Sequence, residues 1–259
     1  MAPMLQQLDT LLLQDHASAR RFTLLGAAPE RIKVVGNLKY DVVIPPPQQL
    51  DKIQHSQLDQ GYCLVCGSTR PGEESILLQA WAQLPDTISG TLVLVPRHPQ
   101  RFTEVADLCD HSGLPWSRIS DPEITPITQG RRLILVDAMG LLLDLYRLAD
   151  LVFVGGSLAD YGGHNPLEAA ALSKAVLMGP YCYNNAQVCS QLEAVGGLQI
   201  TTARHVCLNL QTLLLDPALC QRMGQAGYHL VQQQKGTLAR HLQHIRDQFY
   251  IQHRNTKVT

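Results

Sequence analysis

The sequence predicts an α/β protein built on a doubly wound, parallel, Rossmann-like sheet. From residue 62 to residue 234, short strand-like runs rich in Val, Leu and Ile alternate with amphipathic helical segments. Strands and helices that alternate in this way form parallel sheets through right-handed crossovers, with helices on both faces. The composition agrees with a globular core, because 45% of the 259 residues are hydrophobic and 17% are charged.

The sheet domain is predicted to span residues 49–235. Its expected strands are Tyr62–Cys66, Thr91–Val95, Leu133–Val136, Leu151–Val154, Ala175–Met178 and Gly197–Thr201. Its expected helices are Glu73–Gln83, Arg101–His111, Leu141–Leu148, Pro166–Leu172, Asn185–Val195, Ala203–Leu215 and Pro217–Gln234. Each helix lies between two strands or after the last one, as crossover connections require.

A different piece precedes this domain. Two expected strands, Thr10–Gln14 and Ile32–Val35, flank an expected helix, Ala17–Leu25. Asp15 is a typical N-cap residue, and Gly26 suits the left-handed position that ends a helix. Two strands and one helix cannot complete a sheet domain, so we interpret residues 1–42 as the remnant of an N-terminal domain.

The remaining segments connect and close the domain. Residues 43–48 contain three consecutive prolines, which exclude regular structure and indicate a linker. From residue 236 to residue 259 the sequence predicts a closing helix followed by a tail. Apolar residues recur in this helix at spacings of three or four and predict one buried stripe: Leu238, Leu242, Ile245 and Phe249.

Charge and cysteine content exclude several function classes. The formal net charge is −1, so no overall field favours nucleic acid as a partner. The pair Cys63 and Cys66 lies in an apolar strand-like run, where positions three apart face opposite ways. We therefore expect buried free thiols, which are typical of the cytosol, rather than a metal or redox site. The chain has neither a signal-peptide pattern nor an apolar run near the ~20 residues of a membrane span.

Ligands of open parallel sheets bind where the carboxyl ends of strands meet. Ser68, Thr69 and Arg70 follow the first strand of the domain. Small residues beside a cation are typical of an anion-binding turn, but they also occur in an ordinary turn between a strand and a helix. In the next turn Pro96 and Pro99 fix the backbone around Arg97, which favours a phosphate over a role as a surface charge. After the third strand, a helix begins at Met139, Gly140 and Leu141. Their backbone could bind a phosphate or face a base, but this pattern alone is only weak evidence for a ligand.

The fourth turn carries the strongest signal. Glycines Gly155, Gly156, Gly162 and Gly163, together with His164, precede the helix that starts at Asn165-Pro166-Leu167-Glu168. Asn165 as N-cap, Pro166 in the first turn and Glu168 as a reciprocal cap explain the helix without a ligand. The glycines favour close approach to a ligand, with helix N–H groups for a phosphate and Glu168 for ribose hydroxyls.

Several segments together resemble one known family. PRHPQRF, LVDAMG, LADLVFVGGSL and GGHNPLEAAAL, with GNLKYD upstream, are similar to motifs of the lipid A 3-deoxy-D-manno-octulosonic acid (Kdo) transferases. The resemblance implies the GT-B architecture of two Rossmann-like domains, of which this chain carries mainly the C-terminal, nucleotide-sugar-binding half. It implies transfer of Kdo from CMP-Kdo to a lipid A precursor, at the cytoplasmic face of the bacterial inner membrane.

The resemblance also implies the roles of particular residues. CMP would be bound by Pro96-Arg97, by Met139-Gly140-Leu141 and by Asn165-Pro166-Leu167-Glu168. Lys39 would stabilise negative charge in the transition state. The alternative interpretation is a surface lysine beside a turn. We expect no metal or other cofactor, since the chain has no Asp-X-Asp pair placed for one. Two residues depart from the family pattern. Leu141 stands where the family usually has an acidic residue, and Arg70 stands where members carry a histidine.

The resemblance places the general base, a glutamate, and the site of the lipid acceptor in the N-terminal domain. We therefore expect residues 1–42 to be a remnant of that acceptor domain, and the chain to be a truncated, split or internally initiated product that is inactive by itself. Two alternatives stay open: a GT-B enzyme that uses a UDP-sugar, and a non-catalytic nucleotide-binding remnant.

Overall fold

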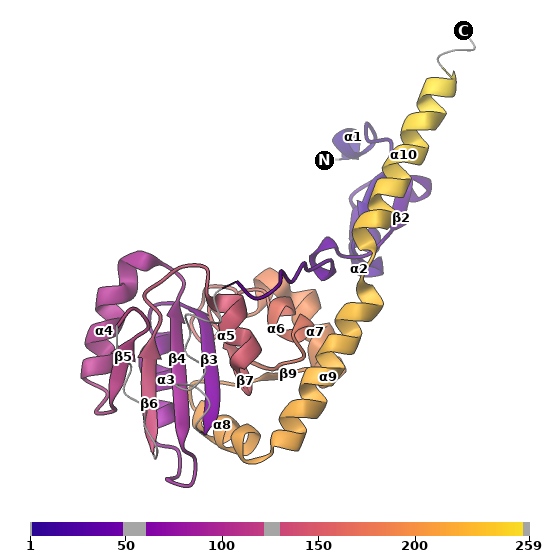
Figure 1. The fold of residues 1–259 in the computed structure, drawn as a ribbon. Coiled ribbons are helices and arrows are strands. Elements are labelled where there is room, and N and C mark those ends of the chain that lie inside the picture. The colour runs from indigo at the N-terminus through magenta and orange to yellow at the C-terminus, as the bar shows by residue number, and fades with distance from the viewer. Residues whose placement is uncertain (1, 49–60, 122–129, 256–259) are drawn as a thin grey trace. The chain divides into compact units, whose positions relative to one another are not determined.

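The computed structural model describes residues 2–48, 61–121 and 130–255. The chain divides into two compact units (Figure 1): Ile44–Leu230 forms unit 2, and Met1–Val43 with Val231–Thr259 forms unit 1. Each unit is described by itself.

Unit 2 contains a seven-stranded sheet with the strand order β5-β6-β4-β3-β7-β8-β9. All its strand pairs are parallel. The strands are β3 (Tyr62–Thr69), β4 (Gly90–Pro96), β5 (Trp116–Arg118), β6 (Arg131–Leu135), β7 (Leu151–Val154), β8 (Ala175–Met178) and β9 (Leu198–Ile200). The order runs outward in both directions from β3 and β7, so the predicted doubly wound parallel sheet is confirmed.

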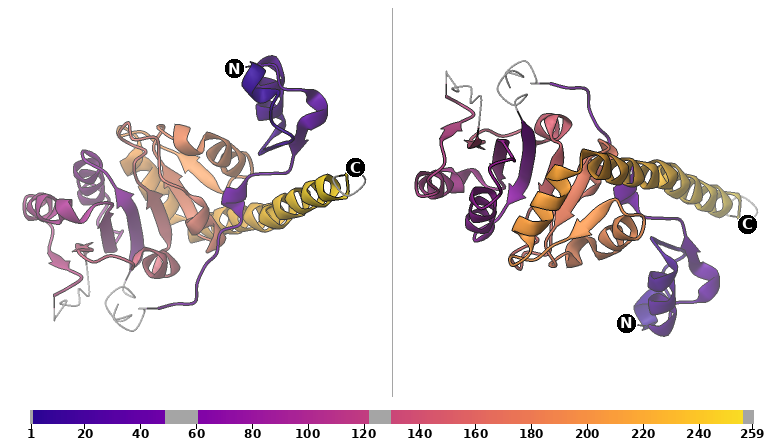
Figure 2. Two further views of the ribbon diagram at one scale, coloured as in Figure 1. Left: turned by 90° about the horizontal axis from the view of Figure 1, so that it is seen from above. Right: turned by 90° about the horizontal axis from the view of Figure 1, so that it is seen from below.

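Helices cover both faces of this sheet (Figure 2). They are α3 (Glu73–Ala82), α4 (Phe102–Asp110), α5 (Leu142–Leu148), α6 (Leu167–Ala171), α7 (Ala186–Ala194), α8 (Val206–Leu215) and α9 (Pro217–Gln234). One core cluster joins alternate strand residues such as Leu64 and Phe153 to Trp81 of α3 and Leu210 of α8. The strand residues between these, such as Val65, are equally buried and face the helices on the other side of the sheet.

Two details of the sheet differ from the prediction. β3 does not end at Cys66 but continues to Thr69, with a register shift between Gly67 and Thr69. Ser68 has φ 57 at this bulge, so Ser68 and Thr69 belong to a strand end rather than to the predicted turn. The edge strand β5 was not predicted, because three half-buried residues, Trp-Ser-Arg, give no apolar run. Cys63 and Cys66 are buried free thiols, as expected.

Unit 1 contains a small βαβ motif. β1 (Leu11–Leu13) pairs in parallel with β2 (Ile32–Val34), and α2 (His16–Leu24) connects them. Asp15 caps α2 by accepting a hydrogen bond from Ser18 N at 2.5 Å, and Gly26 has φ +97 after the helix, both as predicted. Unit 1 also contains the short helices α1 (Ala2–Leu5), η1 (Pro29–Arg31) and η2 (Leu38–Tyr40), and the long α10 (Thr237–Asn255).

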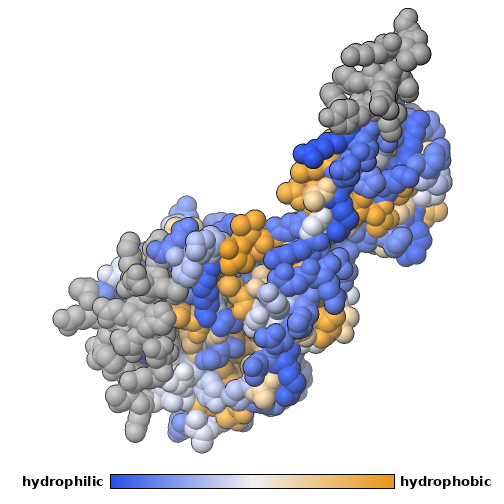
Figure 3. Space-filling model, turned by 45° about the vertical axis from the view of Figure 1, so that its right-hand side comes forward, coloured by the Kyte–Doolittle hydropathy of each residue, from blue (hydrophilic) through white to orange (hydrophobic). Residues whose placement is uncertain are grey.

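The start of α10 is tied to the segment that follows β2. The carboxylate of Asp41 accepts hydrogen bonds from Gly236 N at 2.6 Å and Leu238 N at 2.5 Å. The predicted buried stripe is wrong, because Leu238, Leu242 and Ile245 are 51%, 43% and 56% exposed. The side chain of Phe249 lies outside the described residues. Figure 3 shows hydrophobic residues among hydrophilic ones on the surface of the protein.

Candidate functional site

Three of the four predicted turns meet at the carboxyl edge of the sheet. They follow β3, β4 and β7, and β3 lies between the other two strands. Arg97 N donates to Thr69 O at 3.1 Å, which joins the β4 turn to the β3 turn. A Cβ on Gly155 would lie 2.5 Å from Ser68 O, so only glycine lets the end of β7 approach the end of β3 so closely.

A buried carboxylate that the sequence analysis missed organises this edge. Glu73, the first residue of α3, is 0% exposed. Its two oxygens accept hydrogen bonds from Gly156 N at 2.7 Å, Ser157 N and Leu158 N at 2.8 Å, and Arg70 N at 2.9 Å. The amides of the glycine-rich turn are therefore occupied by the chain's own carboxylate. The amides of Gly156, Ser157 and Leu158 are thus not free to donate to a ligand, while the predicted close approach of the glycines to a ligand stays a prediction.

Arg70 and two histidines lie together over this turn. Arg70 donates a hydrogen bond to His98 Nε2, and its guanidinium carbon lies 4.4 Å from the centre of the Tyr161 ring. A Cβ on Gly156 would lie 3.0 Å from His164 and 3.6 Å from the Arg70 side chain, so both side chains lie over that glycine. The three turns thus bring together Arg70, His98 and His164, which the sequence could not place relative to one another.

The environment of His164 is strongly positive. The pKa of His164 is lowered to about 4, mainly by burial and then, in decreasing order, by the charges of Arg97, Arg70 and His98. Its Nε2 is buried and makes no hydrogen bond to the described residues. An imidazole held neutral among cations, with one nitrogen unpaired, fits a position beside a bound anion.

The predicted helix start at Asn165 is only partly as expected. Asn165 Oδ1 accepts from Leu167 N at 3.2 Å, but the helix begins one residue later than predicted, and Pro166 rather than Asn165 is its N-cap. Among the described residues, no backbone N–H donates to Glu168 to close the predicted reciprocal cap. α6 has five residues, so positive charge at this edge comes from arginine side chains rather than from a helix dipole. Burial raises the pKa of Glu168, and the nearby Arg97 opposes that shift.

The rest of this turn is held by its own backbone. Gly163 has φ +74, and its N–H donates to Gly156 O at 2.6 Å. Its carbonyl accepts from Asn185 Nδ2 at 2.9 Å. Gly163 therefore fixes the path of the loop that presents His164.

The third predicted turn follows β6, the neighbour of β4. Gly140 has φ +86 and Met139 is 58% exposed, whereas Leu141 is buried. The Leu141 side chain faces the protein, so this position offers a ligand its backbone alone. The preceding Asp137 accepts from Ser120 Oγ at 2.7 Å and pairs with Arg118 at 3.5 Å.

Lys39 lies on η2 of unit 1, apart in the chain from the other predicted residues. Asn37 Oδ1 accepts from Lys39 N at 3.0 Å and caps this short helix. The structure describes the two units separately, so the predicted role of Lys39 stays a prediction. Within residues 2–48, 61–121 and 130–255, no group of three or more His, Cys, Asp or Glu side chains could hold a metal ion. No helix among these residues is both long and apolar enough to span a bilayer.

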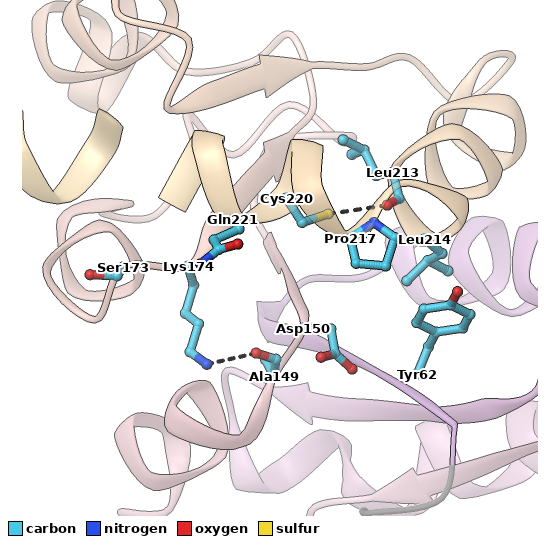
Figure 4. Close-up of a pocket in the computed structure, with 10 residues that line it drawn as sticks. All are labelled: Tyr62, Ala149, Asp150, Ser173, Lys174, Leu213, Leu214, Pro217, Cys220 and Gln221. Atoms are coloured by element: carbon cyan, nitrogen blue, oxygen red, sulfur yellow. Dashed lines mark hydrogen bonds between the residues drawn. The ribbon is translucent and has the colours of Figure 1, made fainter. Parts of the chain in front are cut away.

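A cavity of about 240 Å³ lies at the other end of the sheet (Figure 4). Its lining residues Tyr62, Asp150 and Lys174 directly precede or begin β3, β7 and β8. Lys174 Nζ donates to Ala149 O at 2.8 Å, and burial lowers its pKa while Asp150 raises it. Because the lysine already has a partner and ligands of such sheets bind at the opposite edge, we do not assign this cavity as the site.

The sheet and the basic turns at its carboxyl edge define the class of protein. It is an α/β, Rossmann-like domain that matches GT-B glycosyltransferases. HepE of Anabaena in complex with UDP matches with a TM-score of 0.54 at 16% identity, over 93% of this chain and 64% of HepE, which shows the fold alone.

The comparisons narrow this class to one family. A family model described as 3-deoxy-D-manno-octulosonic-acid transferase (kdotransferase) matches residues 1–42. The 3-deoxy-D-manno-octulosonic acid transferase of Haemophilus influenzae is 33% identical over 92% of this chain and 56% of its own length. The 3-deoxy-D-manno-octulosonic acid transferase of Bordetella pertussis is 31% identical over 93% of this chain and 56% of its own length. The C-terminal CMP-Kdo binding domain of WaaA from Acinetobacter baumannii matches with a TM-score of 0.61 at 27% identity, over 72% of this chain and all of that domain.

The chain belongs to the family of 3-deoxy-D-manno-octulosonic acid transferases, as the sequence motifs predicted. It spans about half the length of the curated relatives that it matches.

Proposed function

We propose that this chain supplies the CMP-Kdo-binding half of a glycosyltransferase that moves Kdo from CMP-Kdo to a lipid A precursor, in lipopolysaccharide synthesis. The observation that carries the proposal is the gathering of Arg70, Arg97 and His164 at the carboxyl edge of the sheet. The match to a CMP-Kdo binding domain supports it, because that match covers 72% of this chain.

In this proposal the exposed Arg97 pairs with the CMP phosphate. An arginine binds a phosphate with two parallel hydrogen bonds, and Pro96 limits how far its backbone can move. Glu168 accepts a hydrogen bond from a ribose hydroxyl, while the backbone of Met139, Gly140 and Leu141 faces the base. Arginines supply the positive charge, so we propose that no metal ion or other cofactor takes part.

The acceptor side of the reaction is also a proposal. The lipid A precursor binds the N-terminal half that the longer relatives have, at the cytoplasmic face of the inner membrane. The general base belongs to that half, because it must reach the acceptor hydroxyl. Lys39 stabilises negative charge on the departing CMP.

Calorimetric titration with CMP, UMP and UDP tests the donor. We expect CMP to bind most tightly. Tighter binding of UDP would indicate a UDP-sugar transferase, and no binding of any nucleotide would contradict a donor site.

Two substitutions test the assignment of the site. Arg97→Ala and Glu168→Ala should each weaken CMP binding by about tenfold, the equivalent of one charge-assisted hydrogen bond. Arg222→Ala is the matched control, because its side chain is 66% exposed on α9. Unchanged CMP affinity in both site variants, with the fold intact by circular dichroism, would contradict the assignment.

A further inference from the structure

We propose that Arg70, with His98 and His164, forms a second anion-binding position that receives the carboxylate of the donor's sugar, separate from the phosphate position at Arg97. This inference rests on the proposed function, since it names what binds the non-nucleotide end of the same donor. It assigns a specificity-determining role to Arg70.

The position of Arg70 suits a ligand at its free side. One of its nitrogens, Nη1, donates to His98 Nε2, and the face of the guanidinium lies over Tyr161 at 4.4 Å. These two contacts hold the plane of the guanidinium in place. Its Nε is buried and makes no hydrogen bond to the described residues. A fixed guanidinium with an unused donor is prepared for a planar, two-oxygen acceptor.

His164 provides a second unpaired polar nitrogen close by. Arg70 Cγ and His164 Nε2 lie 3.6 Å and 3.3 Å from the position that a Cβ on Gly156 would take. The His164 Nε2 is buried and has no hydrogen-bond partner among the described residues. An unpaired buried polar nitrogen is costly unless a ligand or water satisfies it. In the tautomer that carries the proton on Nε2, His164 donates to the same group as Arg70.

The neighbouring charges favour an anion there. Arg97 and Arg70 both act on His164 as positive charges. The carboxylate of Glu73 lies beneath, but its oxygens are saturated by four backbone N–H groups. Glu168 lies within the influence of Arg97. The Glu73 oxygens are thus already used by backbone donors, and the Arg70 guanidinium makes no ion pair with a carboxylate among the described residues.

The chemistry of the proposed donor supplies two anions. A CMP-linked octulosonic acid carries a phosphodiester and a carboxylate, each with one negative charge at neutral pH. Two arginines from different turns match these two groups. Arg97 therefore binds the phosphodiester and Arg70 binds the carboxylate. Arg70 suits the carboxylate because Tyr161 and His98 hold its guanidinium plane in place.

The test compares two ligands that share the cytidine phosphodiester, of which only CMP-Kdo carries the sugar with its carboxylate: CMP-Kdo and cytidine 5′-(methyl phosphate). Calorimetry on the full chain should show CMP-Kdo binding at least about tenfold more tightly, the equivalent of one charge-assisted contact. Arg70→Gln should reduce that preference by about tenfold and leave the affinity for the methyl phosphate within threefold. Arg70→Lys, which keeps the charge without the planar fork, should retain part of the preference. Arg222→Gln should change nothing.

The outcomes separate this inference from the proposed function. Equal weakening of both ligands by Arg70→Gln would place Arg70 on the phosphate and overturn the carboxylate position. An undiminished preference in both Arg70 variants would overturn it too. If neither ligand binds the wild-type chain, the proposed function itself fails. If Arg70→Gln does not fold, the same comparison is made with Arg70→Lys alone, where an unchanged preference again overturns the inference.

Discussion

His164 shows how a single side chain reports on the charge around it. Its imidazole is packed over Gly156 between turns that carry Arg70 and Arg97. A histidine in water has a pKa near 6.5, and both burial and neighbouring cations favour its neutral form. At neutral pH the folded chain therefore holds His164 without charge, so Nε2 can serve either as donor or as acceptor.

The lowered pKa predicts a pH dependence of stability. The folded pKa of His164, about 4, lies below the unfolded value, so the unfolded chain binds the proton first as the pH falls. Stability that is fully present above about pH 6.5 should then decrease towards pH 4. His164→Asn should lose less stability over this range in urea denaturation, while His205→Asn, on an exposed histidine, should behave like the wild type. Parallel curves for wild type and His164→Asn would contradict the lowered pKa.

At the scale of elements, Glu73 joins the first turn of α3 to the loop after β7. A fully buried carboxylate is tolerated because backbone N–H groups surround it. Those hydrogen bonds reach Arg70, Gly156, Ser157 and Leu158. The loop that presents His164 thus depends on a residue that lies 91 positions earlier in the chain. Glu73 positions the site without contacting the proposed ligand.

Glu73→Gln should therefore destabilise unit 2 markedly. The amide NH₂ of glutamine meets N–H donors where the carboxylate accepted them, which leaves donors unpaired at a cost of about 1–3 kcal/mol. Urea denaturation measures the free energy of unfolding. Glu104→Gln is the control, since its side chain is 55% exposed and its pair with Arg101 should contribute under about 1 kcal/mol. Equal effects of the two substitutions would refute the role of Glu73.

Local patterns in the sequence predicted the sheet, because its strands are buried apolar runs and its helices lie between them. The Asp15 cap and the cationic Arg97 turn follow from residue types at fixed positions, so they too could be predicted. The role of Glu73 could not be predicted, because its hydrogen-bond partners are backbone groups far away in the sequence. An acidic residue in the first turn of a helix is also common in helices without such a role. That the amides of the glycine-rich turn meet this carboxylate could not be predicted for the same reason, whereas the role of the turn in ligand binding stays a prediction.

At the scale of the whole molecule, unit 1 exposes much apolar surface. Leu24 is 88% exposed, and Leu25 and Leu38 are 45% and 49% exposed. A hollow of about 840 Å³ lies between α2, β2 and α10, with Leu24 and Val34 in its lining. The two-stranded sheet of β1 and β2 is too small to bury these side chains. Apolar patches of this kind promote association.

We therefore expect the isolated chain to self-associate as its concentration rises. Sedimentation velocity should show a shift to larger species, because contact between two such patches removes apolar surface from water. Leu24→Glu should return the chain towards a monomer, since a charge at the most exposed leucine opposes its burial. Leu208→Glu serves as the control: Leu208 is also well exposed, at 59%, but lies on α8 of unit 2. If the wild-type chain stays monomeric at every concentration, or if Leu208→Glu acts as strongly as Leu24→Glu, unit 1 is not the cause of association.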